Sequence, residues 1–128
     1  MSGYFLDTHT AIWFFDDNAA LSSTADQIIS DGTNRIYMSM ASAWELAIKI
    51  SIGKLNFADR TAGFLRLAET CEMNIIPIKP KHLTVLETLP LIHRDPFDRL
   101  IIATALAEQL TIITADENIA RYDVLQIW

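Results

Sequence analysis

Short apolar runs alternate with helical segments along the whole chain, and this alternation limits the fold more than any other feature. We expect strands at residues 4–6, 35–38, 74–78, 110–114 and 124–127. We expect helices at residues 8–15, 23–31, 39–53, 62–72, 81–89, 96–109 and, briefly, after 116. Such alternation is typical of crossover connections between parallel strands. The sequence therefore predicts an α/β fold, a central, mostly parallel sheet of about five strands with helices on both faces.

Local signals set several of these boundaries. Asp7-Thr8 can begin a helix through the Thr8 hydroxyl, and Ser22 or Ser23 can cap the next one. Gly53 is expected to end the long central helix. Because Pro77 and Pro80 bound the strand at 74–78, we place that strand at an edge of the sheet.

Length and composition predict one compact domain over residues 1–128. The chain has 128 residues, 51% of them hydrophobic and 20% charged, which suffices for a real core. No apolar stretch is long enough to span a bilayer, and the N-terminus lacks an export signal, so we expect a cytoplasmic protein with no membrane partner. The single cysteine, Cys71, excludes an internal disulfide and is expected to be buried.

The net charge of −6 lowers the expectation of a nucleic-acid partner without removing it. Proteins that bind nucleic acids usually carry a basic surface. A bound metal would reverse the local charge, and five cations could still form a basic rim: Lys49, Lys54, Arg94, Arg99 and Arg121. Composition alone therefore does not identify a substrate.

Four carboxylates interrupt or end apolar elements: Asp7, Glu45, Asp98 and Asp116. A carboxylate beside a core costs free energy unless its charge is compensated, and hard divalent cations take oxygen ligands of this kind. Ligands of open parallel sheets bind beyond the carboxyl ends of the strands, and Asp7 and Asp116 each follow a strand. If the first and fourth strands are neighbours, these two carboxylates face one crevice.

Each carboxylate also has a purely structural interpretation. Asp7 and Asp116 are suitable helix N-caps. Asp98 lies in the first turn of a helix that Asp95 and Pro96 begin, where the helix dipole favours a negative charge. Glu45 can pair with Lys49 four residues later on the same helix. Taken one at a time, these residues leave both interpretations open.

The four motifs together are more informative than any one of them. In order, they are Tyr4-Phe5-Leu6-Asp7-Thr8-His9, Ser42-Ala43-Trp44-Glu45-Leu46-Ala47, His93-Arg94-Asp95-Pro96-Phe97-Asp98-Arg99-Leu100 and Thr114-Ala115-Asp116. From Gly3 to the C-terminal strand, the chain resembles the PIN-domain family and, within it, the VapC-type ribonuclease toxins of bacterial toxin–antitoxin systems. The resemblance implies a parallel α/β sheet in which the first and fourth strands are neighbours.

The resemblance also implies a function and a site. Asp7, Glu45, Asp98 and Asp116 match the acidic residues that hold Mg²⁺ or Mn²⁺ in the family, and Thr114 matches a hydroxyl that often supports them. Oxygen-only ligands favour these ions over zinc. One or two ions would activate a water for attack on an RNA phosphodiester. Family members are usually homodimers, and a cognate antitoxin from the neighbouring gene inhibits them.

The sequence is compatible with two alternative functions. A catalytically silent PIN-like module would only bind a partner. A phosphatase of the haloacid-dehalogenase type also places an Asp after its first strand, but that family needs a second Asp where this chain has His9.

Three further features have two interpretations each. His9 either lines the site or makes a local hydrogen bond. Arg99 either contacts phosphate or pairs with Asp95. Residues 13–15, Trp-Phe-Phe, are expected to pack in the core, with a dimer or antitoxin contact as the second possibility.

Overall fold

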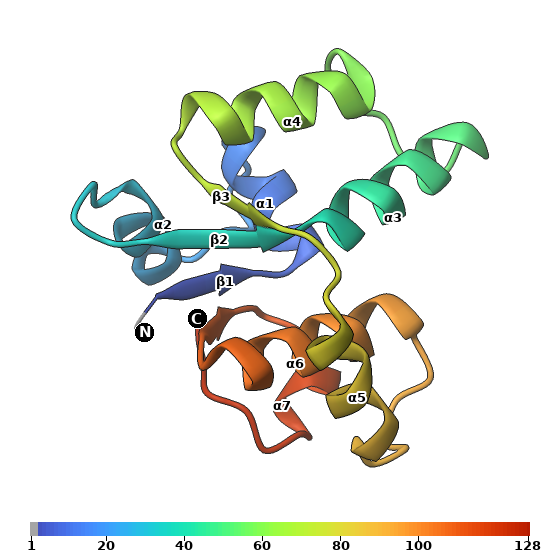
Figure 1. Ribbon diagram of the computed structural model, residues 1–128. Helices are drawn as coiled ribbons and strands as arrows, with labels where there is room; N and C mark the ends of the chain where they lie inside the picture. The colour runs from blue at the N-terminus through green and yellow to red at the C-terminus, as the bar shows by residue number, and fades with distance from the viewer. Residues whose placement is uncertain (1–2) are drawn as a thin grey trace.

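The computed structural model describes residues 3–128, and a five-stranded parallel sheet forms its centre (Figure 1). The sheet order is β3-β2-β1-β4-β5, and every neighbouring pair is parallel. The strands are β1 (Tyr4–Leu6), β2 (Ile36–Ser39), β3 (Asn74–Ile76), β4 (Thr111–Ile113) and β5 (Gln126–Ile127). The predicted fold class is confirmed, and β1 and β4 are neighbours.

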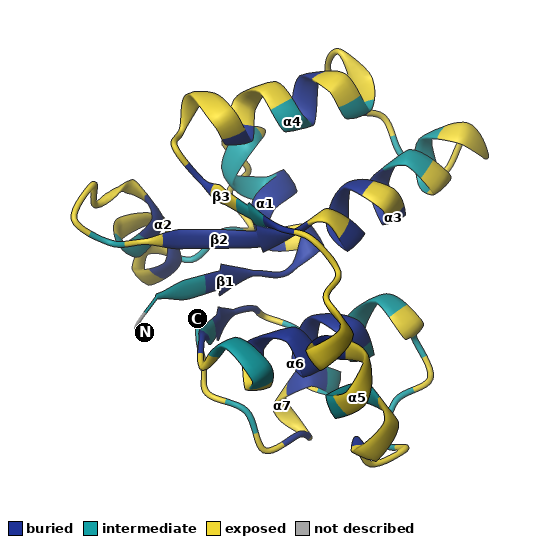
Figure 2. Cartoon of the chain, in the orientation of Figure 1, coloured by how far each residue is buried: buried dark blue, intermediate teal, exposed yellow. Residues whose placement is uncertain are grey.

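Helices cover both faces of this sheet. They are α1 (Thr8–Phe15), α2 (Ser23–Ser30), α3 (Met40–Ser51), α4 (Arg60–Thr70), α5 (Pro80–Thr88), α6 (Pro96–Glu108) and α7 (Glu117–Ala120). Helices α1, α3 and α4 lie on one side of the sheet in Figure 1, and α5, α6 and α7 lie on the other. Figure 2 shows that buried residues gather in the strands and on the helix faces turned toward them.

Side chains of the central strands alternate between two hydrophobic clusters. Leu6, Met38 and Ile113 belong to the cluster under α1 to α4. Their predecessors in the three strands, Phe5, Tyr37 and Ile112, belong to the cluster under α5 to α7. Strands buried on both faces are apolar throughout, which explains why these runs show no polar alternation in the sequence.

The strand register brings three polar residues to one edge of the sheet. Leu6 pairs with Met38 on one side and with Ile113 on the other. The next residue of each chain segment is Asp7, Ser39 and Thr114 respectively. Because the strands are parallel, all three lie at the same carboxyl edge, where β1 meets β4 and the strand order reverses.

Several predicted helix boundaries are confirmed by their caps. The Ser22 and Ser39 hydroxyls accept hydrogen bonds from backbone N–H groups at the starts of α2 and α3. Gly53 adopts a φ of +74° just beyond α3. The prediction for Thr8 was wrong, because Asp7 caps α1 and the Thr8 hydroxyl bonds to α3 instead. Strand β3 is an edge strand, as predicted, and it ends before Pro77.

The aromatic run of α1 packs in the core, as expected. Phe15 makes edge contacts with Phe57 and Phe64, with ring centroids 6.5 and 5.4 Å apart. Trp13 makes a similar contact with Trp128. The expectation for Cys71 was wrong, since this residue follows α4 and is exposed. Residues 3–128 contain no helix with the length and hydrophobicity of a transmembrane segment.

Candidate metal centre

Asp7 is a buried carboxylate at the end of β1. It is 5% exposed, and its Oδ1 accepts a hydrogen bond of 2.8 Å from the Thr10 N–H as the N-cap of α1. Its Oδ2 accepts a hydrogen bond from the Thr114 hydroxyl at the end of β4. Burial raises the pKa of Asp7, while the bonds from Thr10 and Thr114 act against that rise.

Thr114 contacts two of the predicted acidic residues, Asp7 through its carboxylate and Asp116 through its backbone. Its Oγ1 donates to Asp7 and accepts a hydrogen bond of 3.0 Å from the Asp116 N–H. Asp116 in turn caps α7, because its Oδ1 accepts from the Asn118 N–H at 2.9 Å. A single hydroxyl therefore fixes the ends of β1 and β4 relative to each other.

Glu45 projects from α3, and both of its oxygens have partners. Oε1 accepts a hydrogen bond of 2.7 Å from the Thr8 hydroxyl, and Oε2 lies 2.8 Å from Lys49 Nζ. Thr8 Oγ1 also lies 2.9 Å from Ser42 Oγ, so α1 and α3 are joined by buried polar contacts. The ion pair with Lys49 that the sequence suggested is present.

Asp98 lies in the first turn of α6, which Asp95 caps through bonds to the Phe97 and Asp98 N–H groups. Burial is the largest cause that raises the pKa of Asp98, to about 7, and the negative charges of Asp95, Asp116 and Glu45 raise it further. The His93 Nε2 lies 3.0 Å from Asp98 Oδ2 and acts in the opposite direction.

Two observations relate the four predicted carboxylates, although among residues 3–128 their oxygens do not form one compact set of ligand atoms. Asp7 and Asp116 line the same pocket, of about 250 Å³, with His9, Thr10, Trp13 and Ala115. Glu45 and Asp116 both act electrostatically on Asp98. The carboxylates thus come from the ends of β1 and β4 and from the N-terminal halves of α3 and α6.

Sequence reasoning missed Thr8 and His93, which contact the carboxylates, and Ser42, which contacts Thr8. Thr8 and Ser42 belong to the quoted motifs, but only the tertiary contact between α1 and α3 gives them a role. His93 lies close to Asp95 as well as Asp98, and one ligand atom from each of the three falls within 4.8 Å of the others. His9 lines the pocket and lies against the Trp13 ring, with centroids 5.9 Å apart.

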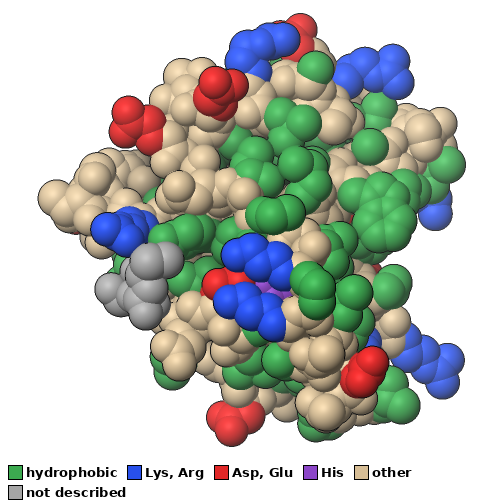
Figure 3. All heavy atoms as spheres, in the orientation of Figure 1, with side chains coloured by type: hydrophobic (Ala, Val, Ile, Leu, Met, Phe, Trp, Pro, Cys, Tyr) green, Lys and Arg blue, Asp and Glu red, His purple; other side chains and the backbone are tan. Residues whose placement is uncertain are grey.

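The Arg99 side chain does not pair with Asp95, one of the two contacts expected for it. Its guanidinium donates to the carbonyl oxygens of Leu89 and Pro90 and to the Tyr122 hydroxyl. Tyr122 accepts a hydrogen bond from the His93 N–H at 2.9 Å, so Arg99 supports the loop that carries His93. With Lys49 paired to Glu45, two of the five cations expected in a basic rim are engaged within the protein. Figure 3 shows no continuous basic surface on the face that it presents.

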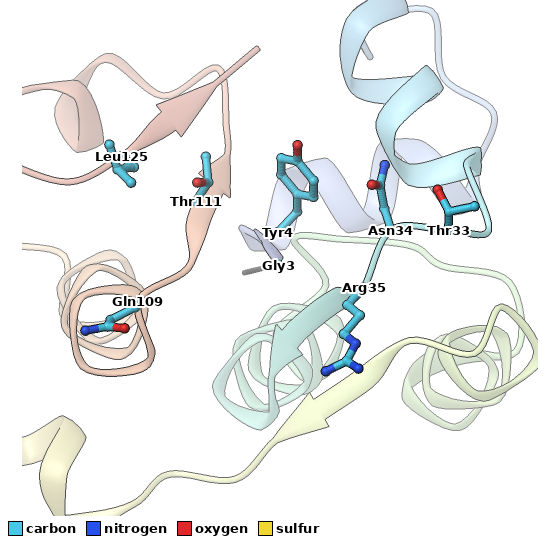
Figure 4. A pocket seen from close by; sticks show the side chains of 8 residues that line it. All are labelled: Gly3, Tyr4, Thr33, Asn34, Arg35, Gln109, Thr111 and Leu125. Atoms are coloured by element: carbon cyan, nitrogen blue, oxygen red, sulfur yellow. The ribbon is translucent and has the colours of Figure 1, made fainter. Parts of the chain in front are cut away.

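A larger pocket lies at the opposite end of the sheet. Its volume is about 680 Å³, and its lining includes Tyr4, Arg35 and Thr111, near the amino ends of β1, β2 and β4 (Figure 4). None of the four carboxylates lines it. In parallel sheets the amino ends of the strands are not the usual ligand side, so the carboxylate region is the stronger candidate.

Comparison with known proteins is consistent with this geometry. The family model of the PIN domain matches residues 4–125. The chain belongs to the PIN domain family. This membership replaces the haloacid-dehalogenase alternative. No curated protein sequence matched the chain.

Solved structures with this fold include chains of toxin–antitoxin complexes over their full length. VapBC2 from Rickettsia felis, bound to a DNA fragment from its promoter, is 19% identical with a TM-score of 0.75, covering 100% of this chain and 99% of that one. FitAcB from Neisseria gonorrhoeae is 17% identical, with a TM-score of 0.66 and coverage of 98% and 96%. VapBC-5 from Mycobacterium tuberculosis is 20% identical, with a TM-score of 0.61 and coverage of 98% of each chain. At these identities the likeness concerns the fold.

Proposed function

We propose that this PIN domain protein is a metal-dependent endoribonuclease and the toxin component of a toxin–antitoxin pair. The observation that supports the proposal is that Asp7 and Asp116 share one pocket at the point where the strand order of the sheet reverses, while Asp116 and Glu45 both act electrostatically on Asp98. We also propose that residues 1–128 form one PIN domain, of which residues 4–125 match the family model.

The donor set suits Mg²⁺ or Mn²⁺. Four carboxylates with a supporting threonine hydroxyl offer hard oxygen ligands, which both ions prefer. Mutual repulsion is evident at Asp98, whose pKa of about 7 reflects burial and the surrounding negative charges. A divalent cation held by Asp7, Glu45, Asp98 and Asp116 would relieve this repulsion.

The residues around the carboxylates would orient them for this role. When bound, a divalent ion supplies charge neutralisation and Lewis acidity at a phosphodiester. Thr114 holds Oδ2 of Asp7, and Thr8 holds Oε1 of Glu45. His93 holds Oδ2 of Asp98 at 3.0 Å. These contacts fix the direction in which each carboxylate presents its oxygens, which is the main requirement for a preorganised centre.

The direct test is RNA cleavage by the purified protein freed of any antitoxin. We expect cleavage with Mg²⁺ or Mn²⁺ and none in EDTA. The double variant Asp7→Asn, Asp98→Asn should lose cleavage, whereas Glu69→Gln, an exposed substitution on α4, should retain it. Cleavage of RNA by the double variant would contradict the proposed site.

Two partners belong to the same proposal, a cognate antitoxin and a second copy of the chain. Support for the antitoxin comes from the neighbours of known structure, which are VapBC and FitAcB complexes. Expression of the chain alone should arrest growth, and the product of the neighbouring gene should relieve the arrest. A catalytically silent PIN-like module would cause no arrest that depends on Asp7 and Asp98.

A further inference from the structure

Lys49 is placed where a lysine can act on the carboxylate centre directly. Its Nζ lies 2.8 Å from Oε2 of Glu45, a residue that is only 4% exposed. Since the Thr8 hydroxyl occupies Oε1, both oxygens of Glu45 are engaged. A metal ion that binds Oε2 of Glu45 must therefore compete with the Lys49 ammonium group for this oxygen.

Arg99, which follows Asp98 in the sequence, makes no comparable ion pair with the carboxylates. Among residues 3–128, no other lysine or arginine forms an ion pair with Asp7, Glu45, Asp98 or Asp116. Arg99 follows Asp98 in sequence but points to backbone carbonyls of residues 89 and 90. In the part of the chain that the structure describes, Lys49 is thus the one lysine or arginine that forms an ion pair with any of these four acidic side chains, namely with Glu45.

We propose that Lys49 is an internal counter-cation of the centre, which neutralises Glu45 until a divalent ion displaces its ammonium group from Oε2. The inference rests on the proposed metal-dependent function. An ammonium and a divalent ion on one carboxylate oxygen would stand a few ångströms apart, and their repulsion is strong in a partly desolvated site. One of the two cations must leave.

Of the two cations, we expect the Lys49 ammonium group to leave Glu45. Its side chain is 36% exposed, so the ammonium has solvent beside it, whereas the Glu45 side chain is 6% exposed. Lysine is a strongly hydrated point charge on a flexible stem, and it makes no bidentate clamp of the arginine kind. An ordinary i,i+4 helix pair gives a different expectation, a small contribution to stability and no effect on metal binding.

The test compares Lys49→Met with Lys81→Met, which removes a lysine that is paired with Glu108 away from the centre. Mn²⁺ affinity is measured by isothermal titration calorimetry, and thermal unfolding is followed in EDTA. We expect Lys49→Met to bind Mn²⁺ about tenfold more tightly than the native protein, because the competing charge is gone. It should also unfold about 5 °C lower in EDTA, because Glu45 loses its partner. Lys81→Met should leave Mn²⁺ affinity unchanged.

A double-mutant cycle locates the effect at Glu45. In a Glu45→Gln background, Lys49→Met should no longer tighten Mn²⁺ binding. Tightening of equal size in that background would overturn the inference, as would unchanged or weaker binding by Lys49→Met. Lys49→Gln, a milder change, provides the same comparison if the methionine variant does not fold. Absence of Mn²⁺ binding by the native protein would instead overturn the proposed function, and the inference with it.

Discussion

At the scale of single residues, a carboxylate can cap a helix and still serve a metal site, because it has two oxygens. Asp7 takes the Thr10 N–H on Oδ1 and presents Oδ2 toward Thr114. Asp116 uses Oδ1 to cap α7. The structural and functional interpretations that the sequence left open for these residues are therefore compatible. Both also explain why an aspartate follows each of the two strands.

Thr114 offers a test of how these oxygens are held. Thr114→Val keeps the shape of the side chain but removes the donor to Asp7 and the acceptor for the Asp116 N–H. We expect the free energy of unfolding in EDTA to fall by about 1–3 kcal/mol, because buried polar groups lose their partners. Thr114→Ser retains the hydroxyl and should stay close to the native value in urea unfolding. If the valine variant were as stable as the native protein, the Thr114 hydroxyl would not stabilise the fold through Asp7.

We expect the free energy of unfolding to be larger when the Asp98 carboxyl is protonated than when it is ionised. Its folded pKa, about 7, exceeds its ordinary value of 3.8, so the folded state binds a proton more readily than the unfolded state. Ionised Asp98 therefore destabilises the fold above pH 7, and stability increases as the pH falls from about 7 toward 4. Asp98→Asn should raise the free energy of unfolding at pH 8 in EDTA on the order of 2 kcal/mol, allowing for partial exposure.

The measurement for Asp98→Asn is urea unfolding at pH 8 and at pH 4. The gain over the native protein should shrink at the lower pH, where the native carboxyl is protonated. The same variant should lose RNA cleavage. A variant that is less stable than the native protein at pH 8 would contradict the assigned cause of the raised pKa.

At the scale of elements, the sequence predicted the helices and strands well where the signal is local. Ser22, Ser39 and the Asp95-Pro96 pair mark helix starts with their own side chains. The errors concern contacts between distant segments. Arg99 bonds to a loop that returns from α5, and the i−4 spacing to Asp95 contains no information about that loop.

His82 also contacts a residue that is distant in sequence, and this contact joins α5 to α6. The ring is fully buried, its Nδ1 accepts from the Lys79 N–H, and its Nε2 lies 2.6 Å from Oε2 of Glu108. Because Nδ1 is an acceptor, Nε2 carries the proton and donates to Glu108. The sequence indicates a short helix here but not the partner of its histidine.

This contact predicts a particular response to acid. The His82 hydrogen bond, followed by Lys81 and Lys79, lowers the pKa of Glu108 below its ordinary value of 4.5. A lowered folded pKa stabilises the protein above about pH 4.5, and this stabilisation is lost as the pH falls through the folded value. Glu108→Gln should therefore lose less stability than the native protein between pH 6 and pH 3. His82→Leu should cost about 1–3 kcal/mol at pH 7 in urea unfolding. Parallel acid curves for Glu108→Gln and the native protein would contradict the role of this carboxylate.

At the scale of the whole molecule, the position of the site depends on the sheet order. Asp7 and Thr114 are 107 residues apart in sequence, and only the pairing of β1 with β4 brings them into contact. Residue patterns placed Asp7, Asp98 and Asp116 at strand or helix ends and Glu45 within a helix. That the two strands are neighbours was implied only by the family resemblance. Hydrophobic periodicity identifies strands without ordering them, so this part of the site could not be predicted from spacing alone.

The surface of α3 bears on how the molecule assembles. Four large apolar side chains are exposed at intervals of four residues along it: Met40, Trp44, Ile48 and Ile52, at 44%, 56%, 37% and 59%. Figure 3 shows hydrophobic side chains gathered over α3 at the right of the molecule. A ridge of i±4 positions packs against an identical ridge in the commonest class of helix packing, and a twofold axis makes such a contact self-complementary. This is the surface that we expect the proposed homodimer to bury.

Ile52→Lys tests this assembly without touching the carboxylates. Ile52 lies at the end of α3, so a lysine there is compatible with the helix and would be charged and desolvated only in a dimer. We expect the native protein to have twice the chain mass by light scattering after gel filtration. The variant should have a single chain mass and should still unfold in a cooperative thermal transition. Leu83→Lys, an exposed apolar position on α5 that is 46% exposed, should remain dimeric. A dimeric Ile52→Lys would place the interface elsewhere, and a variant that is dimeric but no longer binds the antitoxin would assign the α3 ridge to that partner.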